Sequence, residues 1–266
     1  MIARSSNASV NHGKKESAGD DSVIEQRERQ SLKQGPYFTV DLHLHTNRGS
    51  ADSNLSPKDM IARAQAIGIG AVCITEHDNA WDLKEIAAMA ADTGVIVLRG
   101  MEVTTEMGHI GVFGLSEYVG GIYKLRELRK VVDKLGGIMV ANHPFRYKLD
   151  PRFSFINPDH QPIDPERPET AAKLEIFEVC DAVEALNGAC SEEENQFALK
   201  VARTLGLAEV AGSDSHSANS IGCVTTLLSE PVRNERELIE AIKARQTRAG
   251  RGLIAGGVTP FDIFTD

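Results

Sequence analysis

Short apolar runs alternate with amphipathic stretches along the chain from residue 37 onward. The apolar runs predict eight strands, at residues 37–45, 71–75, 95–100, 109–115, 137–143, 182–187, 208–216 and 223–228. Helix patterns separate most of them, at residues 56–68, 80–92, 121–135, 191–206 and 233–245. Strands that are apolar on both faces and alternate with helices are typical of a parallel sheet, and this many units favour a closed or nearly closed barrel. The pattern therefore predicts an α/β fold.

Two segments do not show this alternation of apolar runs and helix patterns. Residues 1–35 hold few large apolar side chains and many polar ones, so we expect a disordered N-terminal tail. Residues 144–168 contain six prolines and no helical period, which predicts a long functional loop over the mouth of the barrel. Hydrophobic residues make up 41% of the whole sequence, which is enough to fill one large core, and we expect a single domain over residues 36–266.

Composition and charge narrow the range of partners. The formal net charge is −9, from 38 acidic and 29 basic residues, which argues against a surface for long nucleic acids. The sequence has no run of about 18 apolar residues and no pattern of a signal or transit peptide, so we expect no membrane association. The four cysteines are scattered without a C-x-x-C pair, as expected for thiols in a reducing cytoplasm.

Candidate chemistry gathers in four short motifs that follow or end apolar runs. They are DLHLHT at residues 41–46, TEHD at 75–78, ANHPFR at 141–146 and GSDSHS at 212–217. His43 and His45 are two apart on a predicted strand, so both imidazoles face one side, where they can chelate a divalent ion. Asp214 and His216 repeat this spacing.

A histidine taken alone is more often an ordinary surface or core residue than a ligand. Here six of the eight histidines lie at or near predicted strand ends. If they were ordinary residues, this shared position would have no explanation. These six are His43, His45, His77, His109, His143 and His216. Strands that deliver so many imidazoles and carboxylates to one end of a sheet predict a multi-metal hydrolase.

The four motifs, together with GMEVTT at residues 100–105, resemble the ordered signature motifs of the PHP family, the polymerase and histidinol phosphatase domain. The resemblance spans about residues 40–217. It implies a distorted, TIM-like (β/α)7 barrel, a cluster of two or three divalent ions and phosphoester hydrolysis. By the same resemblance, the metal ligands are His43, His45, Asp52, His77, Glu102, His143, Asp214 and His216, with Glu102 as the carboxylate that bridges two ions.

One further ligand is left open between His109 and Glu184, and Glu184 is slightly preferred, as a ligand or as the partner of one. Asp78 and Asp41 are each expected to accept a hydrogen bond that orients an imidazole. Nitrogen and oxygen ligands without thiolate suit Zn, Mn or Fe.

The ligand set predicts hydrolysis by metal-activated water, with Asp214, His216 and Glu102 as the catalytic residues. Positive and polar groups near the mouth would hold a phosphate. Arg146 is the best candidate, accompanied by Arg48 and Asn187, with Lys148 and Arg152 behind them.

The leading hypothesis is a stand-alone phosphoesterase acting on a small phosphomonoester, such as a nucleotide, a sugar phosphate or a compound like histidinol phosphate. One alternative is a hydrolase of a C–N or carboxylic ester bond on the same fold, because a site that activates water can serve carbonyl chemistry. The other is a non-catalytic PHP module that binds a partner protein. The sequence indicates neither the substrate nor the oligomeric state.

Overall fold

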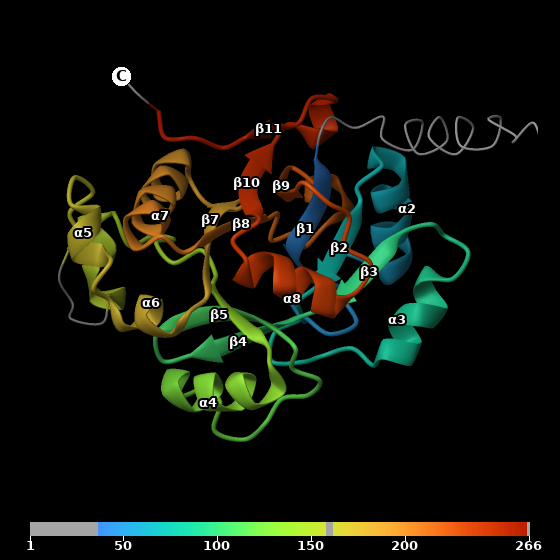
Figure 1. Ribbon diagram of the computed structural model, residues 1–266, viewed down its shortest axis with the longest axis horizontal. Coiled ribbons are helices and arrows are strands. Elements are labelled where there is room, and N and C mark those ends of the chain that lie inside the picture. The colour runs from blue at the N-terminus through green and yellow to red at the C-terminus, as the bar shows by residue number, and fades with distance from the viewer. Residues whose placement is uncertain (1–36, 158–161, 265–266) are drawn as a thin grey trace, which may run out of the picture. The chain divides into compact units, whose positions relative to one another are not determined.

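The computed structural model describes residues 37–157 and 162–264, and the expected tail over residues 1–35 therefore lies outside the described residues. Its strands are β1 (Phe38–Leu44), β2 (Ala71–Ile74), β3 (Ile96–Arg99), β4 (Met101–Thr105), β5 (Gly108–Phe113), β6 (Ile138–Ala141), β7 (Ala182–Asn187), β8 (Ala208–Gly212), β9 (Val224–Leu228), β10 (Thr247–Arg251) and β11 (Thr259–Pro260). Its helices are α2 (Pro57–Ile67), α3 (Leu83–Ala90), α4 (Leu125–Leu135), α5 (Pro168–Ala171), α6 (Glu175–Val179), α7 (Glu192–Leu205) and α8 (Glu235–Lys243). Figure 1 shows their arrangement.

All eight predicted strands and all five predicted helices are present, each within a few residues of its expected bounds. The cap residues of α2 explain why its ends were readable. The Ser56 side chain accepts from the Asp59 backbone N–H, and Gly68 ends the helix in the left-handed region at φ 63°. The sequence did not reveal β4, β10, β11, α5 or α6. These are short elements. Strand β4 alternates apolar and polar residues, but it lies inside the GMEVTT motif, which was interpreted as a metal-ligand motif and not as a strand.

The strands form two sheets, with the orders β11-β10-β9-β1-β2-β3 and β4-β5-β6-β7-β8. Pairing is parallel across β1-β2-β3 and across β6-β7-β8. It is antiparallel for β9 against β1 and for β4-β5-β6. The mixed α/β class is confirmed, whereas the expectation of an all-parallel sheet is wrong. The hairpin of β4 and β5 turns through only two residues, which reverses the chain before a helix can intervene.

Two single backbone bridges join the sheets, one between Leu44 and Ser215 and one between His77 and Glu102. Both bridges run parallel and lie next to the metal-ligand motifs. Among the described residues, the continuous strand ladders stop at these points and do not close into a barrel. The bridges nevertheless place the end of β1 beside the segment after β8, and the segment after β2 beside β4, so segments of both sheets meet at the ligand motifs.

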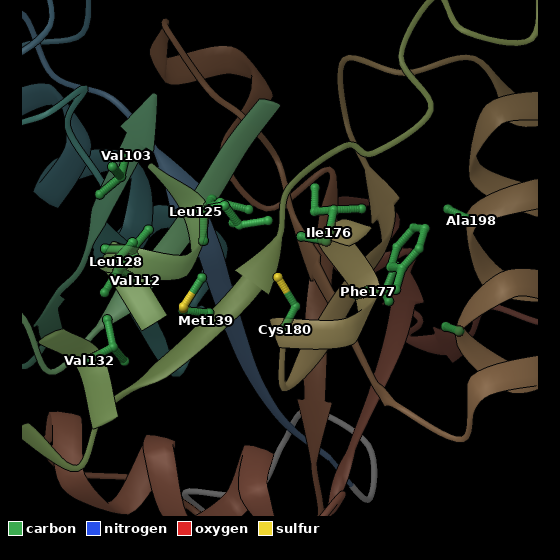
Figure 2. Close-up of a cluster of buried hydrophobic side chains, with 14 of the residues drawn as sticks. Val103, Val112, Leu125, Leu128, Val132, Met139, Ile176, Phe177, Cys180 and Ala198 are labelled. Carbon is green, nitrogen blue, oxygen red and sulfur yellow. The ribbon is translucent and has the colours of Figure 1, made fainter. Parts of the chain in front are cut away.

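The largest apolar cluster supports the second sheet. Val103, Val112 and Met139, from β4, β5 and β6, pack in one cluster with α4, α6 and α7. Figure 2 shows Leu128 of α4 beside Val112 of β5, and Phe177 of α6 beside Ala198 of α7. The predicted loop at 144–168 contains a 3-10 helix at Pro151–Ile156, and its residues 158–161 lie outside the described part.

Candidate metal centre

His43 and His45, near the end of β1, bring two imidazoles to the same side of the strand. Their Nε2 atoms lie 3.0 Å apart, and both side chains are buried. The backbone beyond them is held by the segment that follows β8, because Asp214 N donates to His43 O at 2.7 Å and His45 N donates to Ser215 O at 2.9 Å. The bridge between the sheets therefore sets the position of both rings.

Glu102, on β4, lies at the centre of a cluster of imidazoles and carboxylates, called the cluster from here on, and is almost fully buried. Oε1 lies 3.2 Å from His43 Nε2, 3.1 Å from His143 Nε2 and 3.2 Å from His109 Nδ1, and Oε2 lies 3.1 Å from His77 Nδ1 and 3.4 Å from His45 Nε2. Burial by itself would raise the pKa of this carboxyl, but the imidazoles around it, His43 foremost, hold the pKa well below its usual range. One carboxylate thus faces five imidazoles from different segments.

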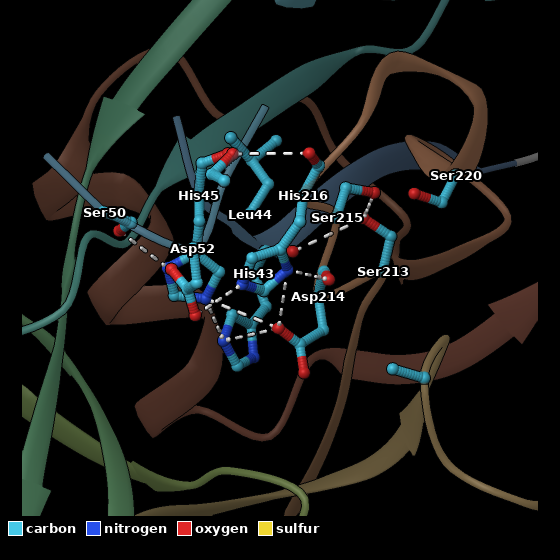
Figure 3. A network of polar contacts seen from close by, with 12 residues as sticks. His43, Leu44, His45, Ser50, Asp52, Ser213, Asp214, Ser215, His216 and Ser220 are labelled. Atoms are coloured by element: carbon cyan, nitrogen blue, oxygen red, sulfur yellow. Dashed lines mark hydrogen bonds and ion pairs between the residues drawn. The ribbon is translucent and has the colours of Figure 1, made fainter. Parts of the chain in front are cut away.

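Asp214 and His216 follow β8 and contribute from the other side (Figure 3). Asp214 Oδ1 lies 3.6 Å from His43 Nε2 and 3.4 Å from His45 Nε2. Asp214 takes a positive φ of 54°, a conformation that turns its side chain out of the strand direction. Burial would raise the pKa of this carboxyl, but the charges near it, from His43 first, lower the pKa strongly.

Asp52 lies at the exposed rim of the cluster. Its Oδ2 is 3.3 Å from His77 Nε2 and 3.3 Å from His216 Nε2, and its side chain is 58% exposed. It joins the two imidazoles that are themselves partly exposed. The cluster is therefore closed at the His43 end and open to solvent at the Asp52 end.

His109 and Glu184, the two alternatives for the remaining ligand, occupy different positions. His109 Nδ1 lies 3.2 Å from Glu102 Oε1, on the same side as the other imidazoles. Glu184 lies behind His43, with Oε1 2.9 Å from Nδ1, and its Oε2 accepts from the His143 backbone N–H at 2.7 Å. Of the two roles expected for Glu184, ligand or partner of a ligand, its contacts match the second, because its oxygens orient His43 and the His143 backbone.

Four triads in the described structure each present one donor atom per residue, with the three atoms within 4.8 Å of one another. They are His45, His77 and His216; His43, Glu102 and His143; His43, His45 and Asp214; and His77, Glu102 and His109. The triads share members, which suits neighbouring ions that use common ligands. Imidazole and carboxylate donors without sulfur fit divalent Zn, Mn or Fe. The residues present thus fit divalent metal binding.

Two of the predicted phosphate-binding residues, Arg146 and Asn187, already form hydrogen bonds within the protein. The Arg146 guanidinium donates from Nη2 to Asn187 Oδ1 at 2.8 Å and also to Asp214 Oδ2. Although burial disfavours its charge, the nearby Asp214 raises the pKa of Arg146 further. Asn187 is buried and its Nδ2 donates to Glu184 at 3.0 Å, so it orients carboxylates in this structure.

The other predicted cations lie in three different settings. Arg48 pairs with Glu85 and lies 4.1 Å from the centre of the Trp81 ring. Arg152 is 83% exposed and pairs with Asp150. Lys148 is half-buried and lines a cavity beside the cluster together with His109, His143 and Arg146.

A buried carboxylate missed by the sequence reasoning supports His45. Glu76 accepts from Ser50 Oγ at 2.6 Å, from the Thr46 backbone N–H at 3.0 Å and from Trp81 Nε1 at 2.9 Å. Ser50 Oγ lies 3.2 Å from His45 Nδ1, so this chain of contacts fixes the ring. Glu76 precedes His77 in the TEHD motif, and this position was the available signal.

The expectation that Asp41 and Asp78 orient imidazoles is wrong. Asp41 accepts from the backbone N–H groups of Ser213 at 2.8 Å and Gly222 at 2.9 Å, and burial raises its pKa to about 6. Asp78 accepts from the Thr104 backbone N–H at 2.9 Å. Both carboxylates therefore fix segments that carry candidate ligands, and neither contacts an imidazole ring among the described residues.

Comparison with known proteins agrees with this arrangement. The model of a PHP-associated family matches residues 192–247, which include Asp214 and His216. A 3',5'-nucleoside bisphosphate phosphatase from Chromobacterium violaceum is 34% identical over 98 residues, which are 34% of this chain and 34% of that protein. The aligned part thus spans about a third of the length of this curated relative.

Two solved structures share the fold at low sequence identity. A two-domain protein from Bacteroides vulgatus, described as containing a predicted PHP-like metal-dependent phosphoesterase, has a TM-score of 0.57 and 20% identity, with 81% of this chain and 66% of that chain covered. PsfC from Pseudomonas syringae has a TM-score of 0.56 and 17% identity, with 83% and 94% covered.

In the part of the chain that the structure describes, no helix combines the length and apolar character needed to cross a bilayer. The ligand motifs, the PHP-associated match and the shared fold agree with one another. Together they confirm the resemblance of this chain to the PHP family.

Proposed function

We propose that this chain is a metal-dependent phosphoesterase that hydrolyses a small phosphomonoester. The observation that carries the proposal is the position of Glu102, whose two oxygens face imidazoles from β1, β5 and the ends of β2 and β6. A buried carboxylate with so many imidazoles around it is suited to bridge two divalent ions.

The residues that would hold the ions are His43, His45, Asp52, His77, Glu102, His109, His143, Asp214 and His216. Glu184 would orient His43. We propose two or three ions of Zn, Mn or Fe, on strands arranged as the distorted barrel that the PHP resemblance implies. Bound ions would supply Lewis-acid chemistry and lower the pKa of water at the site.

Two observations support a small phosphorylated substrate, the name of a related protein and the position of Arg146. The relative from Chromobacterium violaceum is named for a nucleoside bisphosphate, which supports a nucleotide over a sugar phosphate or a compound like histidinol phosphate. In this chain, Arg146 carries a permanent positive charge at the edge of the cluster, next to Asp214. A phosphate that approaches the cluster would meet this charge and gain directional hydrogen bonds from the guanidinium.

The test is a screen of the metal-reconstituted protein for release of inorganic phosphate. Substrates would be nucleoside bisphosphates, nucleoside monophosphates, sugar phosphates and histidinol phosphate, with Mn or Zn supplied in turn. Hydrolysis of a phosphomonoester that disappears after chelation and returns with the metal supports the proposal. Turnover of amide or carboxylic ester substrates without phosphate release would favour the alternative hydrolase. Bound metal with no turnover of any of these would favour a partner-binding module.

The surroundings in which the protein works are part of this proposal. We propose a reducing cytoplasm, because the four cysteines are scattered in the sequence without a C-x-x-C pair. The net charge of −9 supports a small phosphorylated substrate over a long nucleic acid.

A further inference from the structure

A small cavity of about 190 Å³ adjoins the metal centre on the side of β5. His109 and His143 line it, and both also contact Glu102, so the cavity and the cluster share a wall. Arg146 and Lys148 line the same cavity. None of its described lining residues is acidic, although the cluster next to it is rich in carboxylates. The cavity is therefore cationic.

The positive groups in this cavity differ in what they already contact. His109 and His143 lie against Glu102, and Arg146 is bound to Asp214 and Asn187. The Lys148 backbone N–H donates to Phe145 O at 2.9 Å, but its ammonium has no ion pair or hydrogen bond to any residue in the described part of the chain. Its Nζ lies over the turn between β4 and β5, 3.9 Å from the position that a Cβ on Gly108 would take.

A half-buried ammonium without a carboxylate beside it carries a desolvation cost that nothing in the described chain offsets. Burial accordingly lowers the pKa of Lys148. An anion in the cavity would supply the missing partner. The volume is below the roughly 300 to 1,000 Å³ of sites that enclose whole drug-sized ligands, so the cavity suits one small charged group.

We propose that this cavity binds a second phosphate group of the substrate and that Lys148 is the residue that selects for it. The inference rests on the proposed function, since the first phosphate is the one attacked at the metal centre. Because His109 and His143 border both places, one small molecule can present a phosphate to each. The preferred substrates are therefore small bisphosphates.

The test compares substrates in matched pairs that differ by one phosphate. Adenosine 3',5'-bisphosphate is paired with adenosine 5'-monophosphate and adenosine 3'-monophosphate, and glucose 1,6-bisphosphate with glucose 6-phosphate. The variants are Lys148→Met, Lys148→Arg and the control Arg152→Met, which removes an exposed cation of the same loop. Lys148→Met should lower kcat/KM about tenfold or more for the bisphosphates, because they lose the contact to the second phosphate, and less than about twofold for the monophosphates. A tenfold loss corresponds to about 1.4 kcal/mol.

Lys148→Arg should restore part of the bisphosphate preference, and Arg152→Met should leave it unchanged. An equal loss of kcat/KM on both members of each pair, or no loss on either, would overturn the role of Lys148. Thermal melting of each variant shows whether a loss reflects unfolding.

A binding measurement separates this inference from the proposed function. If the wild-type protein hydrolyses none of these compounds, the proposed function fails, and calorimetric titration of the metal-reconstituted protein with adenosine 3',5'-bisphosphate decides about the cavity. Weaker binding to Lys148→Met than to the wild type, with equal binding of the monophosphates, supports the second phosphate site. Equal affinity of both proteins, or no binding to either, overturns it.

Discussion

Five imidazoles surround Glu102, and in the proposed metal centre this one residue would join neighbouring ions. Its two oxygens divide these rings between them: His43, His143 and His109 face Oε1, and His77 and His45 face Oε2. A carboxylate in this position can supply one oxygen to each of two ions and one negative charge to both.

Glu102→Gln should abolish phosphoester turnover and lower the bound metal to less than half of the wild-type content. An amide keeps the shape of the side chain and loses its charge, so the ions lose their shared counter-charge while the packing remains. Metal content is measured by elemental analysis and the fold by circular dichroism. A variant with wild-type metal content and rate would show that Glu102 does not bridge the ions.

Arg146→Ala should lower kcat/KM for the best phosphomonoester by about 30-fold, equivalent to about 2 kcal/mol. The guanidinium contacts Asp214 and Asn187 in the described structure and supplies a fixed positive charge beside the cluster. Arg152→Ala is the matched control, because that exposed guanidinium pairs with Asp150. Unaltered steady-state kinetics of the Arg146 variant would assign it a surface role.

The sequence could identify the residues at the site better than their individual roles. Spacing two apart on a strand was enough to pair His43 with His45, since side chains alternate along a strand. Whether His109 or Glu184 faces the cluster depends on the pairing of β5 and β7 with their neighbours, which residue types do not encode. Asp41 likewise precedes two ligands in sequence but contacts backbone groups that are about 170 residues away or more.

At the scale of elements, close approach of β8 to β1 places Asp214 beside the two histidines of β1. Gly212 ends β8, and a Cβ there would lie 2.7 Å from His43 N and 2.9 Å from Glu184 Oε1. Both distances are far below normal contact for carbon, so the approach requires glycine at this position. The positions of Asp214 and His216 thus depend on Gly212, two residues before Asp214.

Gly212→Ala should destabilise the protein by about 2 to 3 kcal/mol, the upper part of the roughly 1 to 3 kcal/mol typical of overpacking. Because β1 would have to move away from β8, metal content should fall as well. Gly120→Ala is the matched control, since a Cβ at Gly120 meets nothing within 4 Å. Chemical denaturation and elemental analysis of both variants test this, and a Gly212 variant as stable as the Gly120 variant would contradict it.

Element prediction succeeded where the local signal was strong and failed where the partner strand decides the outcome. Helix α7 was readable because Ser191 and Glu194 form a capping box and Gly206 ends the helix. The direction of β5 and β6 was not readable, because an apolar run has the same pattern in parallel and antiparallel pairs. Strand β10, TRAGR, has few large apolar residues and pairs with β9 through its backbone.

At the scale of the whole molecule, the candidate metal centre brings together segments that are far apart in the sequence. Its candidate ligands come from residues 43–52, 77, 102–109, 143 and 214–216, and both sheets contribute to them. The sheets are joined near the cluster by the two bridges at Leu44 and His77. Ions held here would link the sheets at the point where the strand ladders do not.

Removal of metal should therefore lower the melting temperature of the wild-type protein by about 5 to 10 °C. An ion that binds the folded state at a concentration about 100 times its Kd adds about 2.7 kcal/mol, and the unfolded chain does not bring these ligands together. Each kcal/mol shifts the melting temperature of a domain this large by roughly 2 to 4 °C. Calorimetric scans with and without chelator, followed by metal replacement, measure the effect. Because Glu102→Gln weakens metal binding, its melting temperature should respond to chelation less than half as much, and an equal response of both proteins would show that the stabilising ions bind elsewhere.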